Sequence, residues 1–417
     1  MLTLQELYNH LAKSSLNGNL DQEVKRFHKD PETRHSLDCL LHPEKHPVVW
    51  RTADCDCSEE EKARCASRCL FDALHVDEKG NVSVDVDQCV GCSQCIDRCK
   101  AEHLAASKDV LPVLAAIKEE DRPVYAIIAP AFLSQFSNHV TPGKLRAAFK
   151  QLGFTGMVEV ALFADILTLK EALEFDATVQ TDQDFLLTSC CCPMWIAMIR
   201  KVYHQLVPHV PGSVSPMVAC GRVIKHLRPG ATVVFIGPCL AKKAEAKEKD
   251  IADAVDYVLT FQEVKELFDL VGLDPAGLPE DEREHSSKAG RIYARTGGVS
   301  QAVKSTVARL RPDRSITVHA RQADGVPACR EMLNALKEGK ITENFLEGMG
   351  CQGGCVGGPR AIIDRKIGAQ HVDEYGEEAP YETPLDNPFV LELLKRLGFD
   401  TVEDLLKHDT IFTRRFD

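Results

Sequence analysis

The stretch FLLTSCCCPMWIAMIRKVYHQL, residues 185–206, carries the pattern on which the fold of this chain depends. A short apolar run is followed by a polar break and then by apolar residues at helical spacing, which predicts a strand, a turn and a helix. Because such alternation is typical of βα units, we expect an α/β domain of two lobes with largely parallel sheets. The same alternation recurs in VYAIIAP then LRAAFKQLG (124–153), MVEVAL then ILTLKEALEF (157–175), TVVFIGPC then AKKAEAKEK (232–249) and YVLT then FQEVKELFDLV (257–271).

The charge and the apolar runs limit the possible classes of protein. The 417 residues carry a formal net charge of −12, which argues against a nucleic-acid partner because no excess of Lys and Arg is present to neutralise phosphates. No apolar run approaches the ~18 residues of a membrane span. The start, MLTLQELYNHLAKSS, reads as an amphipathic helix without a signal core, so we expect a cytoplasmic protein with no membrane partner.

Seventeen cysteines are the unusual feature of the composition. In a reducing compartment, clustered cysteines bind metal or carry out redox chemistry more often than they form disulfides. Cys39, Cys220 and Cys329 stand alone, and we expect them to be buried as small apolar side chains.

The segment CVGCSQCIDRC, residues 89–99, has the C-x2-C-x2-C-x3-C spacing of bacterial ferredoxins. A zinc site is the alternative, although zinc sites seldom use four thiols this close together. Upstream, Cys65-x3-Cys69 matches the end of such a run, whereas Cys55-x-Cys57 departs from its beginning. The segment resembles a two-cluster ferredoxin domain with an altered first loop. The resemblance implies one 4Fe-4S cube on Cys69, Cys89, Cys92 and Cys95, and another on Cys55, Cys57, Cys65 and Cys99.

Three further cysteine motifs lie in the α/β region, each where a strand or loop leads into a helix. They are TSCCCPMW (188–195), GPCLAKKAE (237–245) and EGMGCQGGCVGG (347–358). Such ends gather at one crevice in parallel sheets, so thiols far apart in sequence are expected to meet. In this order the motifs resemble TSCCP-x-W, MPC-x2-K-x2-E and E-x-MAC-x2-GC-x2-GG of the iron-only (FeFe) hydrogenases.

That resemblance implies an H-cluster, in which a 4Fe-4S cube is linked to a diiron subsite with CO, cyanide and an azadithiolate. Its cube would be held by Cys192, Cys239, Cys351 and Cys355, with Cys355 bridging to the diiron subsite. Lys242 would hydrogen-bond a cyanide, and Met349 would pack beside the diiron subsite. A solvated helix lysine is the ordinary alternative for Lys242. The family has methionine where this chain has Gly237, and we expect the glycine to open space over the site.

The family has two cysteines before the proline, and this chain has three. Alignment on Pro193 makes Cys192 the cluster ligand and Cys191 the proton-relay thiol, whereas alignment on Thr188 moves each role back by one, to Cys191 and Cys190. We prefer the first alignment. The resemblance continues the proton route through Glu171 and Glu174, which share a helix face. The family's relay serine aligns with Pro211, so Ser213 or a water would replace it.

The expected function is reversible reduction of protons to dihydrogen, with electrons passing through two 4Fe-4S clusters to a ferredoxin or similar carrier. Separate maturation proteins build the diiron subsite in this family. The alternatives are a slow dihydrogen sensor and a hydrogenase-like iron–sulfur assembly protein. The expected domains are an N-terminal helical segment (1–50), an α+β ferredoxin-like domain (51–120), the catalytic domain (121–365) and a C-terminal helical tail (366–417).

Overall fold

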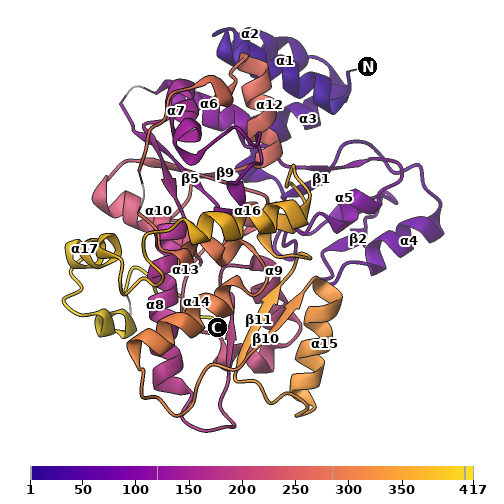
Figure 1. Cartoon of the computed structure of the whole chain (residues 1–417). Coiled ribbons are helices and arrows are strands. Elements are labelled where there is room, and N and C mark those ends of the chain that lie inside the picture. Colours follow the sequence, from indigo (N-terminus) through magenta and orange to yellow (C-terminus); the bar gives the residue numbers. More distant parts are fainter. Residues whose placement is uncertain (1, 120, 284, 408–409, 417) are drawn as a thin grey trace.

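Two parallel sheets form the centre of the molecule (Figure 1). The computed structural model describes residues 2–119, 121–283, 285–407 and 410–416. One sheet has the strand order β6-β5-β8-β9 and the other β10-β11-β7, and every pairing in both is parallel. Their bounds are β5 Val124–Ile128, β6 Gly156–Glu159, β7 Leu186–Thr188, β8 Thr232–Gly237, β9 Tyr257–Thr260, β10 Ala320–Asp324 and β11 Phe345–Met349.

The expectation of a mixed α/β fold with parallel sheets is confirmed. The inner strands β5 and β8 are largely apolar because helices cover both faces of a parallel sheet. Strand β8, TVVFIG, pairs with β5 on one side and β9 on the other, and its side chains from Val233 onward are buried.

The helices of this region surround the two sheets (Figure 1). Several begin at a side-chain cap: Thr141 caps α7, and Thr260 with Glu263 forms a capping box on α12. The bounds are α7 Pro142–Leu152, α8 Ala161–Thr178, α9 Pro193–Lys201, α10 Pro216–Leu227, α11 Ala241–Glu245, α12 Phe261–Val271, α13 Lys288–Arg291, α14 Gly298–Leu310 and α15 Val326–Lys337. Two expected helices are shorter than predicted. The helix after Cys192 ends at Lys201, and the helix after Cys239 ends at Glu245.

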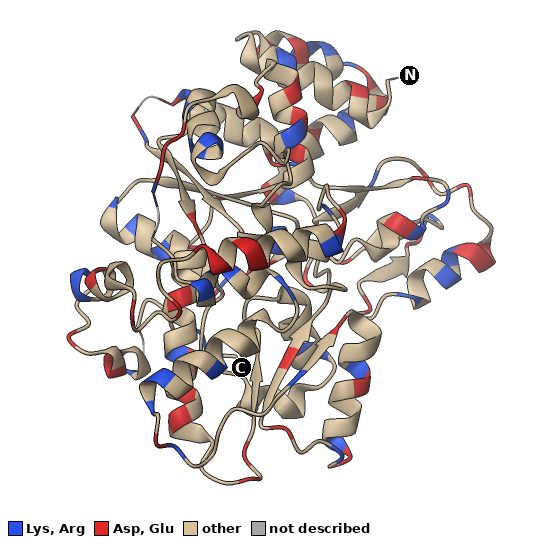
Figure 2. Cartoon of the chain, in the orientation of Figure 1, with Lys and Arg blue, Asp and Glu red and all other residues tan. Residues whose placement is uncertain are grey.

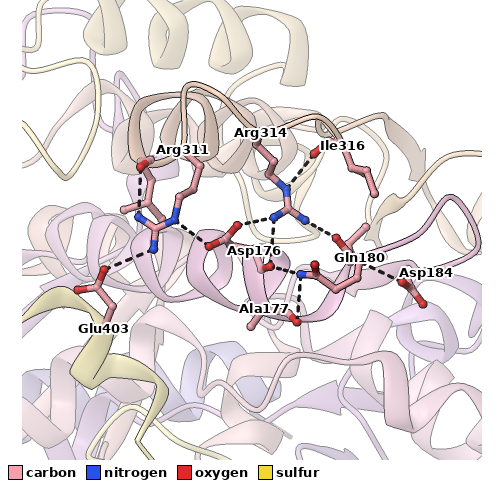
Figure 3. A network of polar contacts seen from close by, with 10 residues as sticks. Asp176, Ala177, Gln180, Asp184, Arg311, Arg314, Ile316 and Glu403 are labelled. Carbon is pink, nitrogen blue, oxygen red and sulfur yellow. Dashed lines mark hydrogen bonds and ion pairs between the residues drawn. The ribbon is translucent and has the colours of Figure 1, made fainter.

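Helix α8 is buried on nearly all sides and packs against α14 and α13. Two arginines at and just after the C-terminal end of α14, Arg311 and Arg314, bind the C-terminal end of α8 (Figure 3). Arg311 Nε donates to Asp176 Oδ2 at 2.9 Å, and Arg314 pairs with the other carboxylate oxygen. Arg314 Nε also donates to the Ile316 carbonyl at 2.9 Å. These bonds hold α8 in one position relative to the neighbouring strands.

The cysteine-rich segment projects to one side of the sheets (Figure 1). It contains two antiparallel strand pairs, β1 with β4 and β2 with β3, and two helices. The bounds are β1 Val49–Arg51, α4 Glu59–Ser67, β2 Leu74–Val76, β3 Val82–Val84, α5 Gln94–Arg98 and β4 Leu104–Ala106. Lys201 of α9 donates to the carbonyls of Asp87 and Gln88 at 3.0 and 3.1 Å, which ties this segment to the α/β region next to Cys89.

The terminal segments are helical, as expected. The first helices are α1 Leu4–Leu16, α2 Leu20–Phe27 and α3 Pro31–Leu41, and the last are α16 Arg365–Glu377 and α17 Pro388–Arg396. Helix α6 Val110–Lys118, which follows the cysteine-rich segment, packs against α1. Within the tail, the stretch TVEDLLKHD (401–409), whose apolar residues predict a short helix, forms only a 3-10 turn, Val402–Leu406, and residues 408–409 lie outside the described part. Figure 2 shows Lys and Arg interspersed with Asp and Glu over the outer helices. In the described ranges, no helix combines the length and apolar character needed to cross a membrane.

Candidate active site

Four partly buried cysteines meet at the carboxyl ends of β7, β8 and β11, as the strand order predicts. Cys192 precedes the first turn of α9, Cys239 lies two residues after β8, and Cys351 and Cys355 follow β11. Burial raises the pKa of Cys239 to about 11 and that of Cys355 to about 12, and the charge of Cys192 adds to both shifts. Thiols this reluctant to ionise need a nearby cation before they become thiolates, so the donor set suits an iron–sulfur cluster.

The backbone around these thiols is close-packed and supplies a donor. Gly350 N–H lies 3.2 Å from Cys192 Sγ. Gly354 has φ +84°, and a Cβ there would lie 2.7 Å from the Thr296 nitrogen. A glycine is therefore required at this position for the loop carrying Cys351 and Cys355 to reach the other two thiols.

Lys242 lies in α11, three residues after Cys239, and is 7% exposed. Its Nζ forms an ion pair with Glu245 Oε2 at 2.6 Å and has no other polar partner in the described chain. Burial opposes the charge, but Glu245 and the neighbouring thiols of Cys191 and Cys239 outweigh it and raise the pKa of Lys242. A buried ammonium with free N–H groups beside four thiols is suited to bind an anionic or strongly polar group. The solvated alternative for Lys242 is wrong.

The expectation that Gly237 leaves open space is also wrong. Strand β8 places Phe235 on the same face as Gly237, and the Phe235 ring fills that volume. A Cβ at position 237 would lie 2.7 Å from Phe235 Cε1. Lys242 Nζ lies 6.0 Å from the centre of the same ring. An aromatic wall therefore replaces the methionine of the family.

The three adjacent cysteines point to different neighbours. Cys190 Sγ donates to Glu171 Oε1 at 3.3 Å. Burial raises the pKa of Cys191 well above its usual value, and the charges of Cys355 and Cys192 raise it further. The structure thus brings Cys190, rather than Cys191, to the first glutamate. The extra residue fits into a turn closed by the Cys192 N–H to the Ser189 carbonyl (3.0 Å).

Glu171 is fully buried, and desolvation raises its pKa to about 7. Its second carboxylate oxygen accepts from Thr188. Glu174 lies one turn farther along α8, and Ser213 Oγ lies 3.5 Å from its Oε2. The serine expected to replace the family's relay serine therefore reaches the second glutamate. A carboxyl group with a pKa near neutrality can both take up and release a proton at physiological pH.

Lys170 and Thr188 are polar neighbours of these glutamates that the sequence analysis did not single out. Lys170 Nζ donates to Ser213 Oγ at 2.9 Å and pairs with Glu174. The signal for it was present, because Lys170 stands four residues before Glu174, the spacing at which opposite charges on a helix pair.

Met349, the last residue of β11, is 1% exposed and packs in the apolar cluster that Cys191 and Cys192 border. The isolated cysteines Cys39, Cys220 and Cys329 are buried, as expected.

The eight cysteines of the projecting segment line a cavity of about 990 Å³, which also reaches Cys239 and Cys351. The charges that raise the pKa of each of these cysteines indicate which of them lie near one another. After burial, the pKa of Cys65 is raised by the charges of Cys99, Cys55 and Cys57. The pKa of Cys92 is raised by burial and then by Cys89 and Cys69. The two ligand sets expected from the ferredoxin resemblance stay a prediction, because the pKa of Cys95, expected in the set with Cys92, is also raised by the charge of Cys65.

Comparison with known proteins places the chain among relatives of several functions. It is 24% identical over 369 residues to the NADP-reducing hydrogenase subunit HndD of Solidesulfovibrio fructosivorans, covering 74% of this chain and 63% of that protein. It is 26% identical over 303 residues to iron hydrogenase 1 of Clostridium pasteurianum, covering 63% and 52%. It is also 25% identical over 390 residues to cytosolic iron-sulfur assembly component 3 of Bos taurus, covering 76% and 80%. The chain thus spans between half and two thirds of the two hydrogenases.

The fold is similar to that of solved FeFe-hydrogenases. The structure of HydA(deltaEFG), which concerns stepwise H-cluster assembly, superposes with a TM-score of 0.59 at 21% identity and covers 74% of this chain and 99% of that one. A HydA1 variant from Chlamydomonas reinhardtii gives a TM-score of 0.59 at 20% identity, with the same coverage. Residues 122–359, more than half of the chain, match the family described as iron only hydrogenase large subunit, C-terminal domain, and the chain belongs to that family.

Proposed function

We propose that this chain is an iron-only hydrogenase that reduces protons to dihydrogen or oxidises dihydrogen. One observation carries the proposal. The thiols of Cys192, Cys239, Cys351 and Cys355 influence one another's pKa, the buried Lys242 ammonium acts on them, and the buried Glu171, whose pKa is about 7, accepts from Cys190 in the same loop as Cys192. A site that only stores iron needs thiols, but it does not need a buried acid linked to the thiol loop.

The residues present fit an H-cluster. Cys192, Cys239, Cys351 and Cys355 would hold its cube, and Cys355 would bridge to the diiron subsite. Lys242 would donate to a cyanide, because its free N–H groups have no acceptor in the described protein. Met349 and Phe235 would line the pocket as apolar walls that exclude water. When bound, the diiron subsite supplies the redox chemistry at which protons and electrons combine.

The protein's own contribution is a route for protons. A proton on Glu171 Oε1 lies in hydrogen-bond contact with Cys190 Sγ, so this thiol can pass it toward Cys191 and the pocket. Cys191 lies nearer to the proposed cluster ligands, since after burial the charges of Cys355 and Cys192 contribute most to its raised pKa. Both cysteines therefore have a place on the route. Beyond Glu171 it continues to Ser213 and Glu174, whose side chain is 16% exposed.

Electrons would travel through the projecting segment, which we propose to be a ferredoxin-like domain (51–120) with two 4Fe-4S clusters. Cys69, Cys89, Cys92 and Cys95 would hold the inner cube, and Cys55, Cys57, Cys65 and Cys99 the outer cube. Cys92 and Cys239 border one small apolar cluster around Met194, and the charge of Cys92 acts on Cys351. The inner cube would thus adjoin the H-cluster, while the outer cube would exchange electrons with a ferredoxin or similar carrier.

An infrared spectrum of the anaerobic full-length chain, matured with the diiron subsite by hydrogenase maturation proteins, tests the proposal. Sharp CO and cyanide bands that shift under dihydrogen are expected. If the bands are missing while iron analysis accounts for all three cubes, the hydrogenase proposal fails.

The second candidate is an iron–sulfur assembly protein, favoured by the similarity to the Bos taurus assembly component over 80% of that protein. Cluster transfer separates the two candidates. An assembly protein would pass a labelled cluster to an apo-acceptor at a rate unaffected by Glu171→Gln. A hydrogenase would retain its clusters and lose turnover in that variant.

A further inference from the structure

Lys170 is a buried cation in the middle of the proposed proton route. Its side chain is 4% exposed, and no part of the expected route requires it. Its ammonium donates to Ser213 Oγ at 2.9 Å and to the Gly212 carbonyl at 3.2 Å, and it pairs with Glu174 Oε1. Since an ammonium has three N–H donors and no acceptor, these contacts use its whole capacity. While it is charged, Lys170 therefore cannot accept a further proton.

The contact with Lys170 fixes how Ser213 is oriented. Because Ser213 Oγ accepts from the ammonium, its own hydrogen is left to be donated, and Glu174 Oε2 lies 3.5 Å away. Within the described ranges, Ser213 makes no hydrogen bond to Glu171. The hydroxyl thus points outward, toward the more exposed glutamate.

The inner glutamate is held from the other side. Thr188 and Cys190 donate to the two carboxylate oxygens of Glu171. On the proposed route, a proton that moves between Glu171 and Glu174 crosses the Ser213 position, after the hydroxyl has turned away from Glu174. A fixed positive charge 2.9 Å from that oxygen disfavours an additional proton there. Fixed cations exclude protons from narrow pores by the same effect.

We propose that Lys170 is a positioning residue that limits the rate of proton transfer between Glu174 and Glu171. Its charge holds the Ser213 hydroxyl toward Glu174 and raises the barrier for a proton to cross. This inference rests on the proposed hydrogenase function.

The test compares Lys170→Gln, which keeps donors for Ser213 and Gly212 but removes the charge, with Lys170→Arg, which keeps the charge. Lys265→Gln is the control, because Lys265 pairs with Asp269 at the same i,i+4 spacing on the surface of α12. The matured full-length proteins are assayed for hydrogen–deuterium exchange between dihydrogen and water and for the solvent isotope effect. Lys170→Gln is expected to speed exchange about tenfold, the size of one charge-assisted hydrogen bond, and to reduce the isotope effect. Lys170→Arg and the control should match the parent.

Two further measurements separate this effect from a structural role and from the function itself. The gain should vanish in the double variant with Ser213→Ala, because the hydroxyl on which the charge acts is gone. In the full-length chain carrying only its cubes, Lys170→Gln should produce an infrared band of a protonated carboxyl group that Glu174→Gln removes. If that band appears but no variant processes dihydrogen, the proposed function fails and the assignment of Lys170 stands. Unchanged or slower exchange in Lys170→Gln, or a gain that persists without Ser213, overturns the inference.

Discussion

Replacing Glu171 by Gln should make the protein more stable at alkaline pH and at the same time abolish efficient turnover. Desolvation raises the pKa of Glu171 from 4.5 to about 7. A carboxyl group whose pKa is raised by folding makes its full contribution to stability at a pH below its pKa in the unfolded chain. This contribution is lost as the pH rises through its pKa in the folded protein. The loss amounts to roughly 3 kcal/mol at about pH 8, since each pKa unit corresponds to about 1.4 kcal/mol. Gln cannot ionise, so Glu171→Gln should retain the stability that the parent loses.

The assay is anaerobic urea unfolding of the parent and Glu171→Gln proteins at about pH 5 and about pH 8, alongside dihydrogen production. The two proteins should unfold with similar free energies at the lower pH and differ by about 2–3 kcal/mol at the higher pH. Turnover should fall by about 10²-fold or more, because the variant cannot take up a proton. Glu263→Gln is the control, since this buried glutamate pairs with Lys243 away from the thiol loop. Equal pH dependence in parent and variant would refute the assignment of a raised pKa to Glu171.

Three further predictions concern other parts of the site. Lys242→Met should lower dihydrogen production by about 10²-fold with the iron content of the cubes unchanged, as measured by iron analysis and gas chromatography; loss of cube iron as well would contradict a role confined to the diiron subsite. Cys65→Ser and Cys69→Ser should each remove a different cube, so the paramagnetic resonance signals that the two variants lose from the parent spectrum should differ; loss of the same signal in both would contradict the two ligand groups. Gly237→Met should destabilise the protein by about 1–3 kcal/mol in urea unfolding through its clash with Phe235, and Phe235→Leu should recover most of that loss; an unchanged midpoint in Gly237→Met would show that the ring does not fill this space.

The parts of the fold that local sequence determines were predictable. Apolar runs such as VVFI in β8 and the helix start at Thr260 depend on neighbouring residues, and the positions of Cys192, Cys239 and Cys351 after strands follow from them. Strand β10, ARQAD, was not expected, because it lies at the edge of its sheet, where most of its side chains are partly or fully exposed. Strand β11 contains Glu347, a buried acid that accepts from the Gly297 and Ser300 N–H groups at the start of α14. A charged residue in a strand is explained only by that distant helix.

The same division holds at the site. Motif spacing predicted the thiols, Lys242 and both glutamates as site residues. The Phe235 ring over Gly237 and the bond from Cys190 to Glu171 depend on which side chain reaches farthest into a shared space. Such outcomes follow from three-dimensional packing and leave no periodic trace in the sequence.

The turn at Ser189 also bears on how this loop can change during evolution. Ser189 has φ +71°, a left-handed conformation that serine adopts at a cost of about 1 kcal/mol or more, and this single residue reverses the chain between Thr188 and Cys192. An added or deleted residue can therefore be absorbed here, while the Trp195 indole still donates to the Thr188 carbonyl at 2.7 Å and keeps β7 and α9 in register. The number of thiols between Glu171 and the helix that begins after Cys192 is thus a trait that natural selection, or a protein engineer, can alter one residue at a time without rebuilding the surrounding scaffold.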